Sequence, residues 1–262
     1  MTKKAILTGA SGGLGTALTH HLQTQNITVI PWNRRAVSID HDGQMRAFLR
    51  ETAPDVVFHL ATVSQPTGRE NEGWVVNVEW TSALARLTAE MGIRFVFTSS
   101  VMVFTDDAKG PFTPDTPPDA RAGYGFEKFT AEERTLAYPN TVVARIGWQI
   151  GDAPGTNNMI DFFHSQSKNG LIGASTRWYP ACSFTADTAA ALFRLSQGAP
   201  GLYLLDSNEK WTFYEIATAL NALHGNQWQI TPNEAFVYDQ RMIDPRAGMP
   251  SLMVRLPVLN LI

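Results

Sequence analysis

The first hundred residues alternate between short apolar runs and longer segments with helical spacing. The apolar runs show little polar alternation, as strands do when a parallel sheet buries both of their faces. They lie at 4–8, 27–30, 55–60 and 94–98. The segments between them, at 16–23, 44–51 and 72–90, are expected to be helices. This order predicts an α/β fold with a doubly wound parallel sheet.

The pattern loosens after residue 150, where a turn-rich break precedes a predicted helix at 159–168. Further along we expect a helix at 186–195, a strand at 202–205 and an amphipathic helix at 213–223. We therefore divide the chain into a main domain at 1–150 and a smaller part at 151–262. The stretch 184–200 is expected to return to the main domain.

A glycine-rich turn follows the first predicted strand and leads directly into the first helix. Gly9, Gly12 and Gly15 lie in it at three-residue spacing. Glycines allow a ligand to approach the backbone, and the free N–H groups at the start of the helix attract an anion. The position favours a dinucleotide pyrophosphate, and hence a Rossmann-type domain. A tight strand-to-helix turn without a ligand is the alternative.

The residues after the second predicted strand bear on the choice of nicotinamide cofactor. In a dinucleotide fold this edge meets the adenosine ribose, where an acidic side chain favours a free hydroxyl and arginine accommodates a phosphate. Asn33, Arg34 and Arg35 lie here, with no carboxylate. The sequence therefore favours NADP over NAD, with Arg34 the first candidate and Arg35 the second. A solvated surface pair is the alternative.

Composition and charge exclude several other classes of protein. The chain has 262 residues, of which 44% are hydrophobic and 17% charged, as in ordinary globular enzymes. A net charge of -3 without a basic block gives no reason to expect nucleic acid or an acidic membrane as partner. Cys182 is the single cysteine and is expected to be a buried thiol. We expect a cytoplasmic protein with a small-molecule substrate, and no metal, because the histidines lack a metal-ligand spacing.

Three side chains suggest acid-base chemistry on a carbonyl group. Tyr124 and Lys128 are four residues apart in a predicted helix and so project from one face. The cation would lower the phenol pKa from about 10 toward a useful value. Ser100, beyond the carboxyl end of a strand, could hold the same substrate oxygen. A chance surface pair and a strand-ending serine are the alternatives.

The motifs together resemble a known superfamily. The glycine turn, the sequence 59–61, Asn77, Ser99-Ser100, and Tyr124 with Lys128 occur in the order seen in extended short-chain dehydrogenases/reductases. Within that superfamily the chain is most similar to the dTDP-4-dehydrorhamnose reductase branch. The cues are the sequences 54–57, 76–78, 145–148, 157–158 and 201–203.

The resemblance implies a role for each of these residues. Tyr124 would protonate a ketone, Lys128 would lower its pKa and bind the nicotinamide ribose, and Ser100 would contact the substrate oxygen. The segment 151–262 would mainly form a substrate-binding lobe. Residues expected along the cofactor are Gly9, Ser11, Gly12, Gly13, Leu14, Asn33, Arg34, Arg35, Leu60, Ala61, Thr62, Asn77 and Thr98, besides Tyr124 and Lys128. Val101 and Trp148 are expected to line the substrate pocket together with Ser100 and Tyr124.

Beside Ser100 the sequence differs from the pattern of the dTDP-4-dehydrorhamnose reductase branch. Val101 and Met102 stand where rhamnose-pathway reductases typically carry an acid and a phenol, and where related dehydratases carry an Asp-Glu pair. Neither side chain can move a proton, which argues against a dehydratase. Our hypothesis is an NADPH-dependent reductase of a ketone on a sugar nucleotide or similar polar metabolite. An NAD(P)-dependent sugar-nucleotide epimerase and a non-catalytic NADP-binding regulatory subunit are the alternatives, and a homodimer is left open.

Overall fold

A parallel sheet of six strands forms the centre of the molecule in the computed structural model, which describes residues 3–63, 66–168 and 170–261. The strand order is β10-β5-β4-β3-β1-β2. The strands are β1 (Lys4–Thr8), β2 (Thr28–Pro31), β3 (Val56–His59), β4 (Arg94–Ser100), β5 (Thr141–Ile146) and β10 (Gly201–Leu205). The predicted α/β fold with a doubly wound parallel sheet is confirmed.

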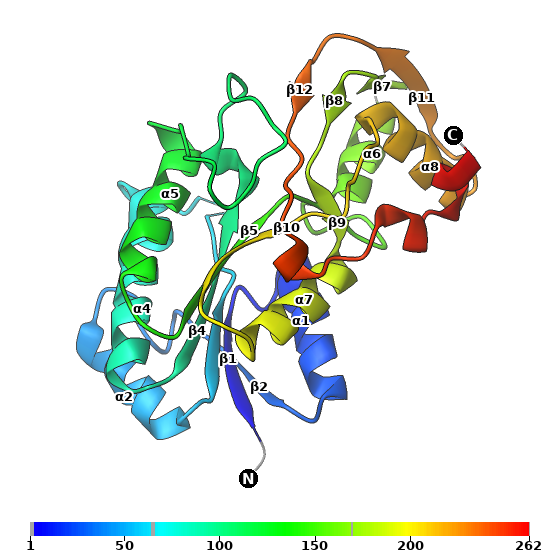
Figure 1. Cartoon of the computed structure of the whole chain (residues 1–262). Helices are drawn as coiled ribbons and strands as arrows, with labels where there is room; N and C mark the ends of the chain where they lie inside the picture. The colour runs from blue at the N-terminus through cyan, green and yellow to red at the C-terminus, as the bar shows by residue number, and fades with distance from the viewer. Residues whose placement is uncertain (1–2, 64–65, 169, 262) are drawn as a thin grey trace.

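Helices cover both faces of this sheet (Figure 1). On one face lie α2 (Asp42–Thr52), α4 (Thr81–Glu90) and α5 (Gly123–Leu136), and on the other α1 (Gly13–Thr24) and α7 (Thr185–Ser196). Leu18 and Leu22 of α1 are buried in one cluster with Leu192 of α7. The helix expected at 186–195 thus packs on the main sheet beside the glycine turn's helix.

The segment predicted as one helix at 72–90 consists of three parts. A short α3 (Glu72–Trp74) is followed by a π-helix, η1 (Val75–Trp80), and then by α4. A π-helix closes its hydrogen bonds over five residues and locally widens the turn, often at functional sites. The hydroxyl of Thr81 donates to the carbonyl oxygen of Asn77 at 2.8 Å within this widened turn. The prediction of a continuous α-helix is therefore corrected here.

The smaller part of the structure contains three short strand pairs and two helices. The pairs are β6 (Trp148–Ile150) with β9 (Cys182–Phe184), β7 (Leu171–Ser175) with β11 (Gln229–Asn233), and β8 (Trp178–Tyr179) with β12 (Tyr238–Asp239). The helices, α6 (Met159–Ser167) and α8 (Phe213–Leu223), begin at polar caps. Asn158 caps α6, and Thr212 forms a capping box with Glu215 at α8. Their apolar faces meet in a core that includes Phe163 and Ile216.

Two irregular segments join the parts near the end of the sheet. The loop at 104–122, after η2 (Val101–Val103), pairs with residues 239–249, which we call the strap. Phe112 N donates to the Arg241 carbonyl oxygen and Ile243 N to the Phe112 carbonyl oxygen, both at 2.7 Å. The chain continues through η3 (Pro245–Ala247), η4 (Leu252–Val254) and η5 (Pro257–Leu261). Within the described ranges, no helix is long and apolar enough to cross a membrane.

Candidate active site

The glycine turn forms a backbone cradle between β1 and α1. Gly9 has a φ of +70°, which glycine adopts without strain, and a Cβ there would lie 3.0 Å from the Ala61 nitrogen. Gly12 is the N-cap of α1 and supplies no side-chain cap. The first amides of the helix therefore keep their N–H groups for another acceptor, as an anion site requires. This cradle fits the pyrophosphate expected from Gly9, Ser11, Gly12, Gly13 and Leu14.

A buried chain of hydrogen bonds fixes the strand ends beside this turn. The Thr8 hydroxyl accepts from the Leu60 and Ala61 nitrogens at 3.1 and 3.2 Å and lies 2.8 Å from His59 Nδ1. His59 Nε2 lies 2.9 Å from the Thr81 hydroxyl. Burial, followed by the nearby Lys128 charge, lowers the pKa of His59 well below its ordinary value. The neutral imidazole therefore acts as a structural bridge between β1, β3 and the start of α4.

The expected cofactor-selecting residues lie in the exposed loop after β2. Asn33 Oδ1 accepts a hydrogen bond from the Arg35 nitrogen at 2.9 Å, which fixes the loop backbone. The side chains of Arg34 and Arg35 are exposed and form no ion pair with any residue in the described ranges. Both guanidinium groups are thus available to an external anion.

Lys128 of α5 is buried against the end of β4, and 2% of its surface is exposed. Its Nζ donates to the Thr98 carbonyl oxygen at 3.1 Å and lies 4.7 Å from the centroid of the Phe97 ring. Burial lowers the Lys128 pKa to about 8, against the opposing charges of Glu132 and Glu127. The ammonium group is therefore close to losing its proton near neutral pH.

Tyr124 lies in the first turn of α5, and 36% of its surface is exposed. The Lys128 Nζ lies 5.6 Å from the centroid of its ring, so the two side chains do share one face of the helix. The phenol pKa is nevertheless raised, because burial outweighs a hydrogen bond with Thr62, and the Glu127 charge adds to the rise. The expected lowering by Lys128 is not found: this structure favours the protonated phenol.

Ser100 ends β4 and is nearly buried. Its Oγ accepts from the Met102 nitrogen at 3.1 Å, which leaves the hydroxyl hydrogen for another acceptor. A Cβ on Gly125 would overlap the Met102 carbonyl oxygen, so the turn after Ser100 packs against the first turn of α5. Val101 is buried, whereas Met102 is 54% exposed. The structure thus brings Ser100, Tyr124 and Lys128 to one end of the sheet, beside the glycine turn.

Comparison with known proteins adds the family. The model described as RmlD substrate binding domain matches residues 3–246. The chain belongs to this family. Among curated relatives, a Bacillus subtilis (strain 168) spore coat polysaccharide biosynthesis protein, SpsK, is 26% identical over 223 residues, covering 83% of this chain and 78% of its own. A Burkholderia thailandensis dTDP-4-dehydrorhamnose reductase is 28% identical over 265 residues, covering 94% and 86%.

Solved structures agree on the fold of this RmlD-family protein. The dTDP-4-dehydrorhamnose reductase of Bacillus anthracis, solved in complex with NADP, has a TM-score of 0.82 at 18% identity. The match covers 100% of this chain and 99% of that one. The resemblance predicted from the motifs is therefore confirmed at the level of family and fold.

Glu127 lies beside the predicted residues of the RmlD-family site but was not itself predicted from the sequence. Asn77, expected near the cofactor, is 1% exposed in the π-helix, and its Nδ2 donates to Glu127 Oε2 at 2.8 Å. Its Oδ1 accepts from the Thr62 hydroxyl at 3.0 Å. Glu127 carries no sequence signal of its own, because a glutamate beside a buried lysine on a helix is ordinarily a solvated residue.

Trp148 makes none of its described aromatic contacts with Ser100, Tyr124 or Lys128. Its indole is half-buried and packs with Phe162, Trp178 and Phe213, at ring distances of 5.3 to 6.0 Å. Together these rings form an aromatic wall of the smaller part, which could stack on a sugar or base. No group of three or more potential metal ligands occurs among the residues described.

Proposed function

We propose that this RmlD-family protein is an NADPH-dependent reductase of a ketone on a sugar nucleotide or similar polar metabolite. One observation supports the proposal: the buried Lys128 cation lies 5.6 Å from the centroid of the Tyr124 ring, and Ser100 ends β4 at the same edge of the sheet as the glycine turn. The relatives named as dTDP-4-dehydrorhamnose reductases support reduction over epimerisation or a non-catalytic regulatory role.

Bound NADPH would supply the hydride. The turn at Gly9, Ser11, Gly12, Gly13 and Leu14 would hold its pyrophosphate, with Asn33, Arg34 and Arg35 at the 2′-phosphate. Leu60, Ala61, Thr62, Asn77 and Thr98 would border its length, and Lys128 its ribose. The fit rests on the open amides of α1 and on the exposed arginine side chains after β2.

The chain's own groups would then handle the proton and the carbonyl oxygen. Ser100 would donate its free hydrogen to that oxygen, because its lone pair already accepts from Met102. Tyr124 would give its proton to the same oxygen as charge develops there, and its raised pKa keeps the proton available. The Lys128 cation would stabilise the phenolate that remains.

The rest of the proposal concerns the setting of this chemistry. Residues 1–150 with 184–200 would form the cofactor domain, and residues 151–262 mainly the substrate lobe, with Trp148 and Val101 in the pocket. Support comes from Gly13, where a Cβ would lie 2.6 Å from Thr156 Oγ1 of that lobe. We also propose a cytoplasmic protein and a homodimer, which cell fractionation and light scattering of the purified protein test.

Replacing Tyr124 by Phe tests the catalytic assignment. Loss of the phenolic hydrogen should reduce ketone reduction about 10²- to 10⁴-fold, while NADPH binding is retained. The measurement is NADPH oxidation with a panel of nucleotide-linked keto sugars, alongside a binding titration. Turnover that persists at the wild-type rate in this variant would refute the role of Tyr124.

A further inference from the structure

The loop between β6 and α6 reaches from the smaller part of the structure to the glycine turn. A Cβ placed on Gly13, the first residue of α1, would lie 2.6 Å from Thr156 Oγ1 and 3.0 Å from Thr156 Cβ. The Thr156 carbonyl oxygen lies farther, at 3.4 Å from the same position. Thr156 is exposed. Its hydroxyl group therefore lies beside the open amides of α1, within reach of a ligand bound there.

Hydrogen bonds of Asn158 determine how the Thr156 hydroxyl is used. Asn158 Oδ1 accepts from the backbone nitrogens of Ile160 and Asp161, at 2.8 and 3.1 Å, because it caps α6. The amide nitrogen must then point the other way, and it donates to Thr156 Oγ1 at 2.9 Å. A hydroxyl has one hydrogen besides its lone pairs. Since its oxygen is the acceptor in this contact, the Thr156 hydrogen remains available to another acceptor.

The fold holds this arrangement in place. Asn158 is 4% exposed, so its amide is fixed in the interior. A Cβ on Gly151 would overlap the Asn158 amide nitrogen, and glycine therefore leaves the space that the amide occupies. Further along the loop, the Gly155 nitrogen donates to Asp161 Oδ1 at 2.8 Å. The threonine hydroxyl is thus positioned by a buried side chain and by the first turn of α6.

We propose that Thr156 is a cofactor-binding residue supplied by the smaller part: its hydroxyl donates a hydrogen bond to the pyrophosphate held at the glycine turn. The inference rests on the proposed function, which places that pyrophosphate at the first amides of α1. The sequence 9–16 contains no basic side chain, so the main domain offers only backbone N–H groups and hydroxyls there. A donor from the loop completes the site, and binding of the dinucleotide then joins the two parts.

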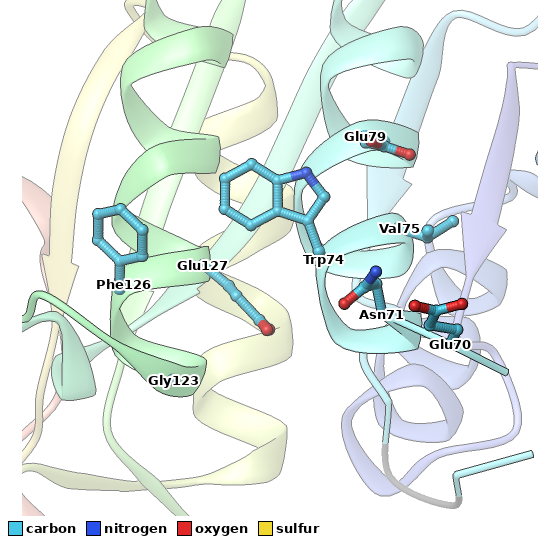
Figure 2. Close-up of a pocket in the computed structure, with 8 residues that line it drawn as sticks. All are labelled: Glu70, Asn71, Trp74, Val75, Glu79, Gly123, Phe126 and Glu127. Atoms are coloured by element: carbon cyan, nitrogen blue, oxygen red, sulfur yellow. The ribbon is translucent and has the colours of Figure 1, made fainter. Parts of the chain in front are cut away.

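The cavity between α5 and η1 offers no alternative place for a diphosphate. Its volume is about 570 Å³, and the carboxylates of Glu70, Glu79 and Glu127 line it (Figure 2). Negative charges at this spacing repel an anion. The glycine turn, in contrast, has no acidic residue in the sequence 9–16. The charge distribution therefore favours the glycine turn, next to Thr156, as the place of the pyrophosphate.

The test compares ligands with and without a pyrophosphate, by calorimetric titration of the full chain. NADPH and NADH both contain one, whereas 2′-AMP carries only a phosphate on the ribose. Thr156→Val replaces the hydroxyl by a methyl group of similar size. This variant should weaken the binding of NADPH and of NADH about tenfold each, because one hydrogen bond to a charged group is lost. Its binding of 2′-AMP should be unchanged.

Two further variants serve as controls. Thr156→Ser keeps the hydroxyl and should retain the wild-type affinity for all three ligands. Thr24→Val removes an exposed hydroxyl at the other end of α1 and should also leave the affinities unchanged. Hydrogen exchange gives a second measurement: NADPH should slow exchange of the backbone amides at 153–157 in the wild type, and 2′-AMP should not.

The outcomes separate this inference from the proposed function. Equal dinucleotide affinity in the wild type and in Thr156→Val would overturn the role of Thr156 and leave the cofactor assignment in place. A loss that extends equally to 2′-AMP would overturn it too, because the pyrophosphate would not be the group contacted. If the wild type bound neither dinucleotide, the proposed function would fail together with the inference. A selective tenfold loss in a protein that reduces no ketone would support Thr156 and refute the reductase.

Discussion

At the scale of single residues, the site holds two titratable groups whose pKa values are shifted in opposite directions, away from each other. Burial lowers the Lys128 pKa to about 8 and raises that of Tyr124. Lys128 donates one hydrogen bond to the Thr98 carbonyl oxygen, which positions the cation. Its ammonium group has two further hydrogens that can bind a ligand. Near neutral pH the phenol of the free protein therefore keeps the proton that the proposed reduction transfers.

Arg34 gives a residue-scale prediction for the proposed cofactor. Removal of its guanidinium by Arg34→Ala should weaken NADPH binding about tenfold, because one charge-assisted contact to a phosphate is lost. NADH binding should change little, since NADH lacks that phosphate. Arg35→Ala serves as the comparison, and fluorescence titration with both nucleotides is the measurement. A parallel loss for NADH and NADPH would contradict the assignment of Arg34.

At the scale of elements, the segment expected to be one helix at 72–90 shows which structural features a hydrophobic pattern predicts and which it does not. The apolar spacing predicted the position of the helical segment in the sequence, because apolar residues recur at the helical period along the face that packs on the sheet. The π-helix inside it is accompanied by a hydrogen bond from the Thr81 hydroxyl to the Asn77 carbonyl oxygen, and a hydrophobic pattern does not predict such a contact. The pattern also does not predict the contact of Glu127 with Asn77, because the two residues are 50 positions apart in the sequence.

The sequence predicted the positions of the motif residues better than it predicted their pKa values, for a physical reason. Tyr124 and Lys128 share a helix turn, so their proximity follows from local geometry. Ser100 follows from the rule that the carboxyl ends of parallel strands meet at one edge. The direction of the Tyr124 pKa shift did not follow, because it depends on burial by segments distant in the sequence.

A buried ion pair gives the element-scale prediction. Glu132 of α5 accepts three hydrogen bonds from the Arg145 side chain of β5, at 2.7 to 3.2 Å, and both residues are almost fully buried. Glu132→Gln should lower the free energy of unfolding by about 3 kcal/mol, because an uncompensated buried cation remains. Urea unfolding measures this loss.

Two further variants test the cause of that loss. The double variant Glu132→Met with Arg145→Met should recover most of it, since both charges are then removed. Glu133→Gln on the exposed side of α5 should change stability by less than about 0.5 kcal/mol. Equal destabilisation by Glu132→Gln and Glu133→Gln would show that the pair is not the reason.

At the scale of the whole molecule, one buried carboxylate connects three distant segments. Asp206, just after β10, accepts from the backbone nitrogens of Cys182, Asn208 and Met242 at 2.8 to 2.9 Å. These bonds tie the main sheet to β9 of the smaller part and to the strap. Burial raises the Asp206 pKa from 3.8 to about 7, although the three N–H groups oppose the rise.

This carboxylate predicts a pH dependence of stability. The folded state binds the proton more tightly than the unfolded chain, so the contribution of Asp206 is greatest below pH 3.8 and is lost as pH rises through about 7. Asp206→Asn turns an amide hydrogen toward the Met242 N–H and should cost about 1–3 kcal/mol. The wild-type advantage over Asp206→Asn should be larger at pH 5 than at pH 8 in urea unfolding. An identical advantage at both values would rule out this titration.

The pairing of Phe112 with the strap bears on how the protein is made. Phe112 leaves the ribosome long before Arg241 and Ile243, which supply its backbone partners. Until the strap emerges, the segment leading to α5 lacks the neighbour that completes its pairing, while the early βα units can already collapse. The nascent chain can thus gain a nucleotide cradle well before it gains a finished reaction cleft, and competence for turnover must wait until the strap has been synthesised.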